Sequence, residues 1–137
     1  MFRFARCNRA ASAVEFAMLL PLFLTLVFGI VVFGSYLTMV HDVQQLAAEA
    51  ARSSVAGLTN SERNSLATTY VSTNAPTYPL LTPAKLTVNA APSANDANVY
   101  VVTVNYDATG SLIYSLPFVP TPSTKIVRSA AIPYGGF

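Results

Sequence analysis

The sequence has little of the chemistry on which enzymes and disulfide-rich domains depend. Its 137 residues include one cysteine and one histidine, and only 10% of them are charged. Cys7 has no partner for an internal disulfide, so the fold must be stable without one. His41 and six acidic residues, spread along the chain, do not supply the three or four convergent ligands of a metal site. We therefore predict no bound metal and no cofactor.

Catalytic and nucleic-acid-binding motifs are also missing. There is no Gly-x-Ser-x-Gly elbow, no phosphate-cradling glycine loop, and no base placed to activate a serine or threonine beyond the apolar segment. The net charge is only +2, and Arg3, Arg6 and Arg9 supply three of the eight basic residues. A positive charge so small and so concentrated is not that of a nucleic-acid-binding protein. We expect neither an enzyme nor a nucleic-acid partner.

What the sequence does have is one long apolar segment. No charged residue occurs from residue 16 to residue 40, a length of about 37 Å as a helix, and a bilayer core is about 30 Å thick. Pro21, Gly29 and Gly34 are tolerated in membrane helices. The apolar run is too long for a secretory signal, and the residues after it continue a helical pattern. We predict a transmembrane helix over residues 11–40, in contact with membrane lipid.

The distribution of arginine predicts the orientation of this helix. Arg3, Arg6 and Arg9 precede the apolar run, and no lysine or arginine follows it closely. Positive residues stay on the cytoplasmic side, so the N-terminus is predicted to be cytoplasmic. Residues 1–10 then form a cytoplasmic leader, residues 11–40 the membrane span, and residues 41–137 an extracytoplasmic domain.

The helix is predicted to continue beyond the membrane. Small and apolar residues recur at steps of three and four and define one face: Val40, Val43, Ala47, Ala50 and Ser54. Polar residues fall elsewhere on the helical wheel: Asp42, Gln45, Glu49 and Arg52. The spacing predicts one rod from about Ser12 to Ala56, ending near Gly57.

The rest of the outer domain alternates like a small sheet. Thr59 and Glu62 have capping-box spacing and predict a second helix from about Asn60 to Tyr70, followed by a loop over residues 73–83. Strands are predicted over residues 85–90, 99–106 and 124–132. The fold class is therefore α+β: a long N-terminal helix, transmembrane in its first half, packed on an antiparallel sheet of three to four strands.

The connection before the last strand is unusually apolar for a loop. It carries Leu112, Ile113, Tyr114, Leu116, Phe118 and Val119 among three prolines. Residues 112–116 fit either a short strand or a helical turn. The apolar side chains fit either a cap on the small core or an exposed patch for a partner. The sequence leaves both pairs of alternatives open.

The only charge near the start of the apolar segment is Glu15. A carboxylate in lipid costs free energy, so its presence there indicates a use. Glu15 is the fifth residue of the chain that would remain after a cut between Ala10 and Ala11. Two other interpretations are that Glu15 reaches the lipid headgroups, or that it pairs with Arg9 in an uncut chain.

The N-terminal residues resemble a known family. The segments that carry the resemblance are RAASAVEFAMLLPLF (residues 9–23), FGIVVFG (28–34), QQLAAEAAR (44–52) and, less specifically, VTVNY (102–106). They are similar to TadE-like pseudopilins, which are bacterial membrane proteins of the tight-adherence (Tad/Flp) pilus system. The resemblance covers most of the chain and is strongest in its first fifty or so residues.

The resemblance implies a processed minor pilin of the bacterial inner membrane, with its C-terminal domain in the periplasm. A prepilin peptidase would cut between Ala10 and Ala11, where the family has glycine before the cut and this chain has Ala10. The protein would then contact other pilins and the Tad assembly platform to support assembly of the adhesive pilus. Glu15 would pair with the new α-amino group on Ala11 of a neighbouring subunit, which is positively charged at neutral pH.

A different class of function stays open beside this one. An uncut, single-span anchor could display the small sheet domain to an extracytoplasmic ligand or a secretion complex. The Ala10–Ala11 junction and Glu15 distinguish the two, because a plain anchor needs neither.

Overall fold

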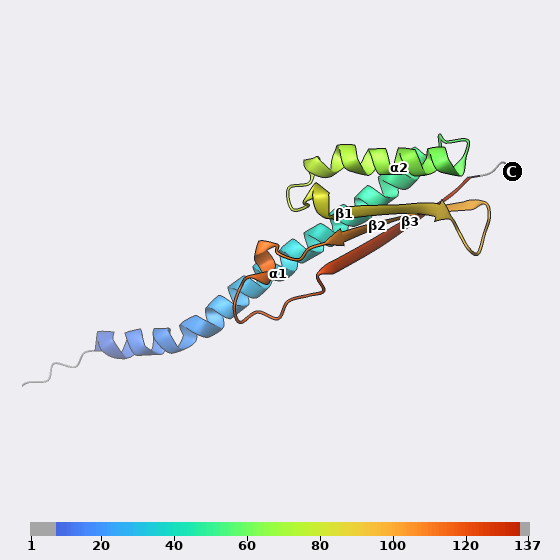
Figure 1. Cartoon of the computed structure of the whole chain (residues 1–137). Coiled ribbons are helices and arrows are strands. Elements are labelled where there is room, and N and C mark those ends of the chain that lie inside the picture. Colours follow the sequence, from blue (N-terminus) through green and yellow to red (C-terminus); the bar gives the residue numbers. More distant parts are fainter. Residues whose placement is uncertain (1–7, 135–137) are drawn as a thin grey trace, which may run out of the picture.

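The computed structural model describes the backbone of residues 8–134 and the side chains from Ala11 onward. Arg3, Arg6 and Cys7 lie outside the described residues, as do the side chains of Arg9 and Ala10. A single long helix, α1 (Asn8–Ser54), runs the length of the molecule and carries every other element on its C-terminal half (Figure 1).

The first part of α1 extends away from the domain and then changes direction. Figure 1 shows the bend after the blue first turns, and Pro21 is the one proline inside the helix. Proline lacks the N–H that would bond the carbonyl four residues earlier, which bends a helix at that point. The Thr25 hydroxyl donates a 2.8 Å hydrogen bond to the Pro21 carbonyl, a contact that also favours bending.

Helix α2 (Asn60–Asn74) begins with the predicted capping box. The Thr59 hydroxyl accepts from Glu62 N at 3.2 Å, and a Glu62 carboxylate oxygen accepts from Thr59 N at 3.1 Å. The helix runs four residues past its predicted end at Tyr70, because Val71 and Ala75 are buried against the domain. Two short 3-10 turns follow, η1 (Ala75–Thr77) and η2 (Pro83–Lys85).

The sheet has three antiparallel strands in the order β1-β2-β3. They are β1 (Leu86–Pro92), β2 (Val99–Asp107) and β3 (Lys125–Pro133), so the predicted α+β fold is confirmed with three strands. Val104 at the centre of β2 pairs with Val88 on one side and with Arg128 on the other. Between β2 and β3 lies a 3-10 turn, η3 (Leu112–Tyr114), which resolves the open choice there in favour of a helical turn.

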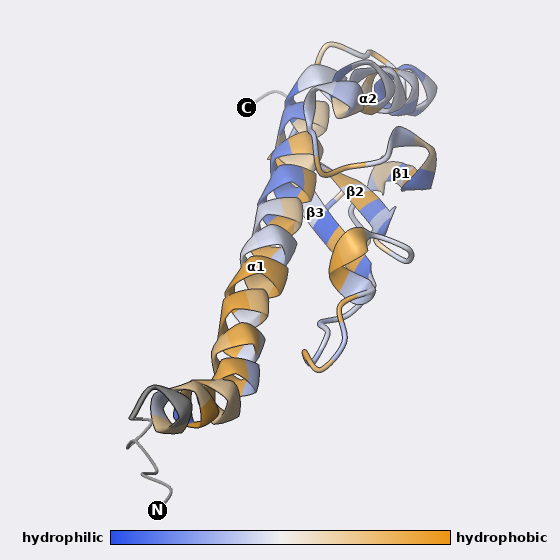
Figure 2. Cartoon of the chain, turned by 90° about the vertical axis from the view of Figure 1, so that its left-hand side faces the viewer, coloured by the Kyte–Doolittle hydropathy of each residue, from blue (hydrophilic) through white to orange (hydrophobic). Residues whose placement is uncertain are grey.

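One face of the sheet holds the core. The side chains of β2 that face the helices are all buried: Tyr100, Val102, Val104 and Tyr106. Helix α1 crosses β2 and β3, and α2 covers β1. The predicted small face of α1 packs here, with Val43, Ala47, Ala50 and Ser54 fully buried. The opposite face of β2, with Val101, Thr103 and Asn105, has no helix over it (Figure 2).

The position of Asp42 corrects the helical-wheel prediction. The wheel placed this residue away from the packed face, yet only 9% of it is exposed. Burial raises the pKa of the Tyr78 phenol, just after η1, and the nearby Tyr70, Asp42 and Glu49 raise it further. The chain leaving α2 therefore passes near Asp42 and Glu49 of α1. Periodicity within one helix cannot anticipate a segment that packs from elsewhere in the chain.

Candidate membrane and assembly surface

The N-terminal half of α1 is an apolar stem with almost no protein around it. Within Ala11–Ser54 one stretch is long and apolar enough to cross a membrane, and almost none of that stretch is buried. Figure 2 shows this half of α1 in orange and the half beside the sheet in mixed colours. Large apolar side chains stand exposed on all sides of the stem: Val14, Phe16, Met18, Leu19, Leu22, Phe23, Leu26 and Ile30. An exposed apolar surface of this kind is compatible with membrane anchoring.

From Phe28 onward the stem has two different sides. Val32 is fully buried, and Phe28 and Tyr36 pack against the core of the domain. Ile30, at 66% exposed, and Leu37, at 63% exposed, face away from it. The domain therefore shields one side of α1 over residues 28–40, which the sequence assigned to the membrane span.

Glu15 lies on the exposed stem, in the second described turn of α1 after Ala11. Among the described side chains, no ion pair involves Glu15. Residues four apart share one face of a helix and differ in height by about 6 Å, so Ala11 and Glu15 stand one above the other. The proposed pairing of Glu15 with Arg9 concerns a side chain outside the described ones.

The junction between Ala10 and Ala11 is helical in this structure. Both residues belong to α1, which begins at Asn8, and Ala11 is exposed. The sequence predicted a rod from about Ser12, so the structure extends the helix across the junction to Asn8.

The far end of the predicted span carries the one histidine. His41 is exposed and Asp42 is buried beside it. Burial raises the pKa of the Asp42 carboxyl, and the neighbouring His41 opposes that rise. Within residues 8–134, no group of three or more His, Cys, Asp or Glu side chains is arranged to hold a metal ion.

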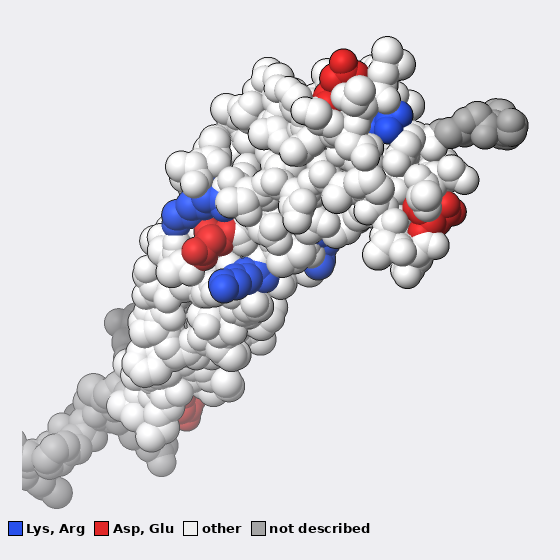
Figure 3. All heavy atoms as spheres, turned by 45° about the vertical axis from the view of Figure 1, so that its right-hand side comes forward, with Lys and Arg blue, Asp and Glu red and all other residues white. Residues whose placement is uncertain are grey.

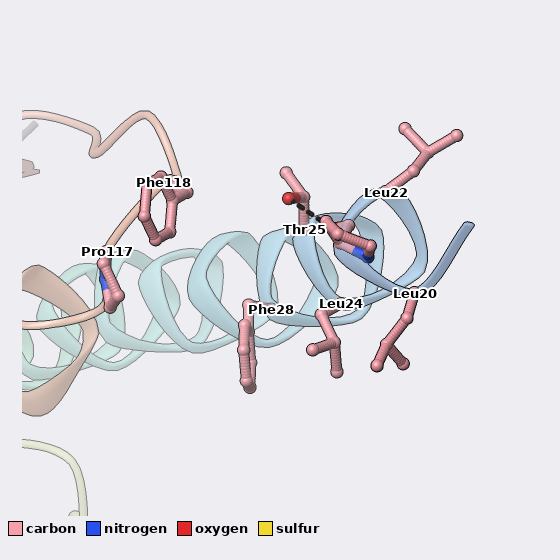
Figure 4. A pocket seen from close by; sticks show the side chains of 8 residues that line it. Leu20, Leu22, Leu24, Thr25, Phe28, Pro117 and Phe118 are labelled. Carbon is pink, nitrogen blue, oxygen red and sulfur yellow. Dashed lines mark hydrogen bonds between the residues drawn. The ribbon is translucent and has the colours of Figure 1, made fainter. Parts of the chain in front are cut away.

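The apolar connection divides between the two roles that the sequence left open. Ile113 and Val119 are 7% and 9% exposed and belong to the hydrophobic core of the domain. Leu112 and Phe118 are 79% and 90% exposed and point away from it. Sequence reasoning missed where this loop lies: Pro117 and Phe118 stand beside the stem, opposite the helix turns that carry Leu24 and Phe28 (Figure 4).

Charged side chains gather on the outer domain. Figure 3 shows blue and red groups around the domain and a largely white stem. Arg52 and Glu49 form an ion pair of 2.5 Å on the surface of α1. At the end of the sheet nearest the stem, the Lys85 ammonium donates to the Thr109 carbonyl, beside Asp107 and Lys125. The molecule is thus polar at its domain and apolar along its stem.

Comparison with known proteins agrees with the sequence resemblance over the stem. Residues 10–52 match the model of the TadE-like protein family. No curated protein and no solved structure matches the chain. The match covers the Ala10–Ala11 junction, Glu15, the apolar stem and the start of the packed helix, and it ends before the sheet. The resemblance to TadE-like proteins is thus confirmed over residues 10–52.

Proposed function

We propose that this protein is a minor pilin that supports assembly of a Tad-type adhesive pilus from the bacterial inner membrane. Its role is structural and not catalytic. The stem crosses the membrane with the N-terminus in the cytoplasm, and the sheet domain stands on the periplasmic side. Its partners are the prepilin peptidase, other pilins and the assembly platform.

The observation that carries the proposal is the exposed apolar stem with a single carboxylate near its start. Phe16, Phe23 and Leu26 are each at least 60% exposed, and nothing in the described part of the chain covers them. Lipid acyl chains shield this apolar surface from water while the subunit is in the membrane. Packing against the stems of neighbouring pilins shields the same surface when the subunit leaves the lipid.

Cleavage between Ala10 and Ala11 would give Glu15 a partner. The new α-amino group on Ala11 would lie one turn from Glu15 of its own chain. A neighbouring stem displaced along the axis by about 6 Å brings the two groups level. Pairing then relieves two charges that are costly in a low-dielectric setting, so it favours one axial stagger between subunits.

Replacing the carboxylate by its neutral isostere tests this role. Glu15→Gln should leave membrane insertion and cleavage intact and reduce the number of assembled pili at least several-fold. Val14→Ala, at a 59% exposed neighbouring position, is the matched control and should assemble normally. Pilus number and the membrane level of the protein are measured together, because equal pilus numbers in Glu15→Gln and wild type would remove Glu15 from the account.

A second candidate function rests on Ala10, which stands where the family has glycine before the cut. If the peptidase does not accept alanine, the chain stays an uncut anchor whose sheet domain binds an envelope or secretion complex. The open face of β2, which carries Val101, Thr103 and Asn105, is the surface available for such a partner. Ala10→Gly would then switch the protein from uncut to cut, whereas an already cut protein would be unchanged.

A further inference from the structure

The connection between β2 and β3 contains no charged residue from Ala108 to Thr124. Ile113 and Val119 of this connection are buried in the core, whereas Leu112 and Phe118 are largely exposed. The exposed pair needs a second explanation.

The tip of this connection forms a groove with the stem. The groove has a volume of about 500 Å³, and one of its walls is helix α1 from Leu20 to Phe28. The other wall is Pro117 and Phe118, so the lining is apolar apart from Thr25. The Thr25 hydroxyl is already bonded to the Pro21 carbonyl, which leaves no unsatisfied donor in the groove (Figure 4).

The backbone of Phe118 is held in an unusual conformation. Its φ is +66°, and it is the only residue other than glycine with a positive φ among the described residues. The left-handed region costs about 1–2 kcal/mol for an L-residue, and a conformation of this kind persists where the surroundings impose it. Here it presents a phenyl ring at the tip, 90% exposed, on the side of the loop that faces the stem.

The length of the stem decides what surrounds this ring. From Phe16 to Phe28 the helix rises about 18 Å, and from Ala11 to Phe28 about 26 Å. Both values fall short of the roughly 30 Å of a bilayer core, and the bend at Pro21 shortens them further. A bilayer core that begins at Phe16 ends near Tyr36, eight residues beyond Phe28, so the groove lined by Phe28 and Phe118 falls within that core.

The charged residues at the end of the sheet nearest the stem are consistent with a groove that lies inside the bilayer core. Lys85, Asp107 and Lys125 lie at the base of the connection, where the chain leaves and re-enters the sheet. Lysine ammonium groups stay at the headgroup level while apolar groups below them enter the hydrocarbon. The charge-free connection then starts at the headgroups and dips toward the acyl chains.

We propose that the tip Leu116–Val119 enters the outer leaflet of the membrane and that a lipid acyl chain occupies the groove between Phe118 and the stem. The sheet domain is thereby seated on the bilayer at two points, the stem and the loop. The inference rests on the proposed membrane span and goes beyond it, because a span alone leaves the domain free to tilt. The surface that Phe118 shares with the apolar stem identifies lipid as the occupant.

The chain contains no tryptophan, so a single introduced tryptophan can report its own surroundings. We would insert Phe118→Trp, in the full chain, into phosphatidylcholine vesicles whose acyl chains carry bromine, a quencher of tryptophan fluorescence. Phe23→Trp places the reporter in the stem, and Leu58→Trp, at an 87% exposed site between α1 and α2, places it at the far end of the domain. Thermal unfolding of each variant confirms that the domain is folded.

The proposal predicts that Phe118→Trp is quenched to a similar degree as Phe23→Trp and several-fold more than Leu58→Trp. Quenching of Phe118→Trp as weak as that of Leu58→Trp would overturn the proposal while leaving the span intact. Weak quenching of Phe23→Trp would instead contradict the proposed membrane span, and with it the proposed insertion of the loop. Quenching at Phe118 that disappears when lipid is scarce, with Phe23 unchanged, would assign the groove to a second copy of the chain.

Discussion

The guanidinium carbon of Arg63 lies 3.7 Å from the centroid of the Tyr134 ring and 5.9 Å from that of Tyr100. The two rings themselves meet edge to face, 5.6 Å apart. One cation on α2 therefore joins the central strand to the end of the described chain. Arg63 Nε has no hydrogen-bond partner among the described residues, so the rings are its main contact.

Removing this cation should destabilise the outer domain. We expect Arg63→Ala to lower the free energy of unfolding by about 1–2 kcal/mol, because a partly desolvated cation over aromatic rings is lost. Thermal unfolding of the full chain in lipid nanodiscs, followed by circular dichroism, measures the change. Arg128→Ala is the control, since the Arg128 side chain lies over no aromatic ring among the described residues and donates a hydrogen bond to the adjacent Val127 carbonyl. Equal losses in both variants would refute the stacking argument.

The turn between α1 and α2 has no room for a side chain at Gly57. A Cβ there would lie 2.7 Å from Arg63 N and 2.8 Å from its Cγ, and the former is backbone that cannot swing aside. We expect Gly57→Ala to cost about 1–3 kcal/mol through overpacking. Gly34→Ala is the matched control, because nothing lies within 4 Å of its added methyl. An unfolding curve for Gly57→Ala that overlays the wild type would contradict the close approach.

The capping box of α2 offers a third test. In Thr59→Ala the Glu62 N–H loses its acceptor, and we expect a loss of about 1 kcal/mol in unfolding free energy. Thr68→Ala, on the exposed surface of the same helix, should be neutral or slightly stabilising, because alanine is the better helix former. A comparison of the two unfolding midpoints isolates the cap from the propensity effect.

The stability of the domain should respond to pH through Asp42. Burial raises the pKa of this carboxyl in the folded chain, so the folded state binds its proton more tightly than the unfolded state. Its contribution to stability therefore grows as the pH falls through the raised value toward the ordinary one. We expect Asp42→Asn to unfold at a higher temperature than wild type at neutral pH, and the difference to shrink in acid.

Asp107 should show the opposite sign and serves as the control. Hydrogen bonds from the Thr109 side chain and backbone lower the pKa of this carboxyl, and Lys85 and Lys125 lower it less. Its stabilisation is present above the ordinary value and is lost as the pH falls through the lowered one. Asp107→Asn should thus be less stable than wild type at neutral pH and equal to it in strong acid. The same direction of change in both variants would contradict the assigned causes.

The elements of this fold were readable from the sequence because local signals agreed with one another. Thr59 and Glu62 gave the start of α2, and the alternation from Val99 to Tyr106 gave the central strand within one residue of its end. The end of α2 was not readable. Thr73 and Asn74 are poor helix formers, and burial of Val71 and Ala75 overrides that preference.

The surface next to the stem depended on contacts between distant parts of the chain. Pro117 and Phe118 come about ninety residues after Leu24 and Phe28, and no periodicity links the two segments. The apolar composition of the loop showed that something unusual lay there, but not where. Burial of Asp42 was hidden as well, because the periodicity of α1 does not show which other segments pack against it.

The measurement that tests the central claim most directly is the N-terminal residue and intact mass of the protein purified from its host membrane. The account predicts a chain that begins at Ala11 and lacks residues 1–10. Such a result would give every subunit the free α-amino group that Glu15 is proposed to meet. A full-length chain that retains Arg3, Arg6, Arg9 and Ala10 would contradict a processed minor pilin and favour an uncut anchor.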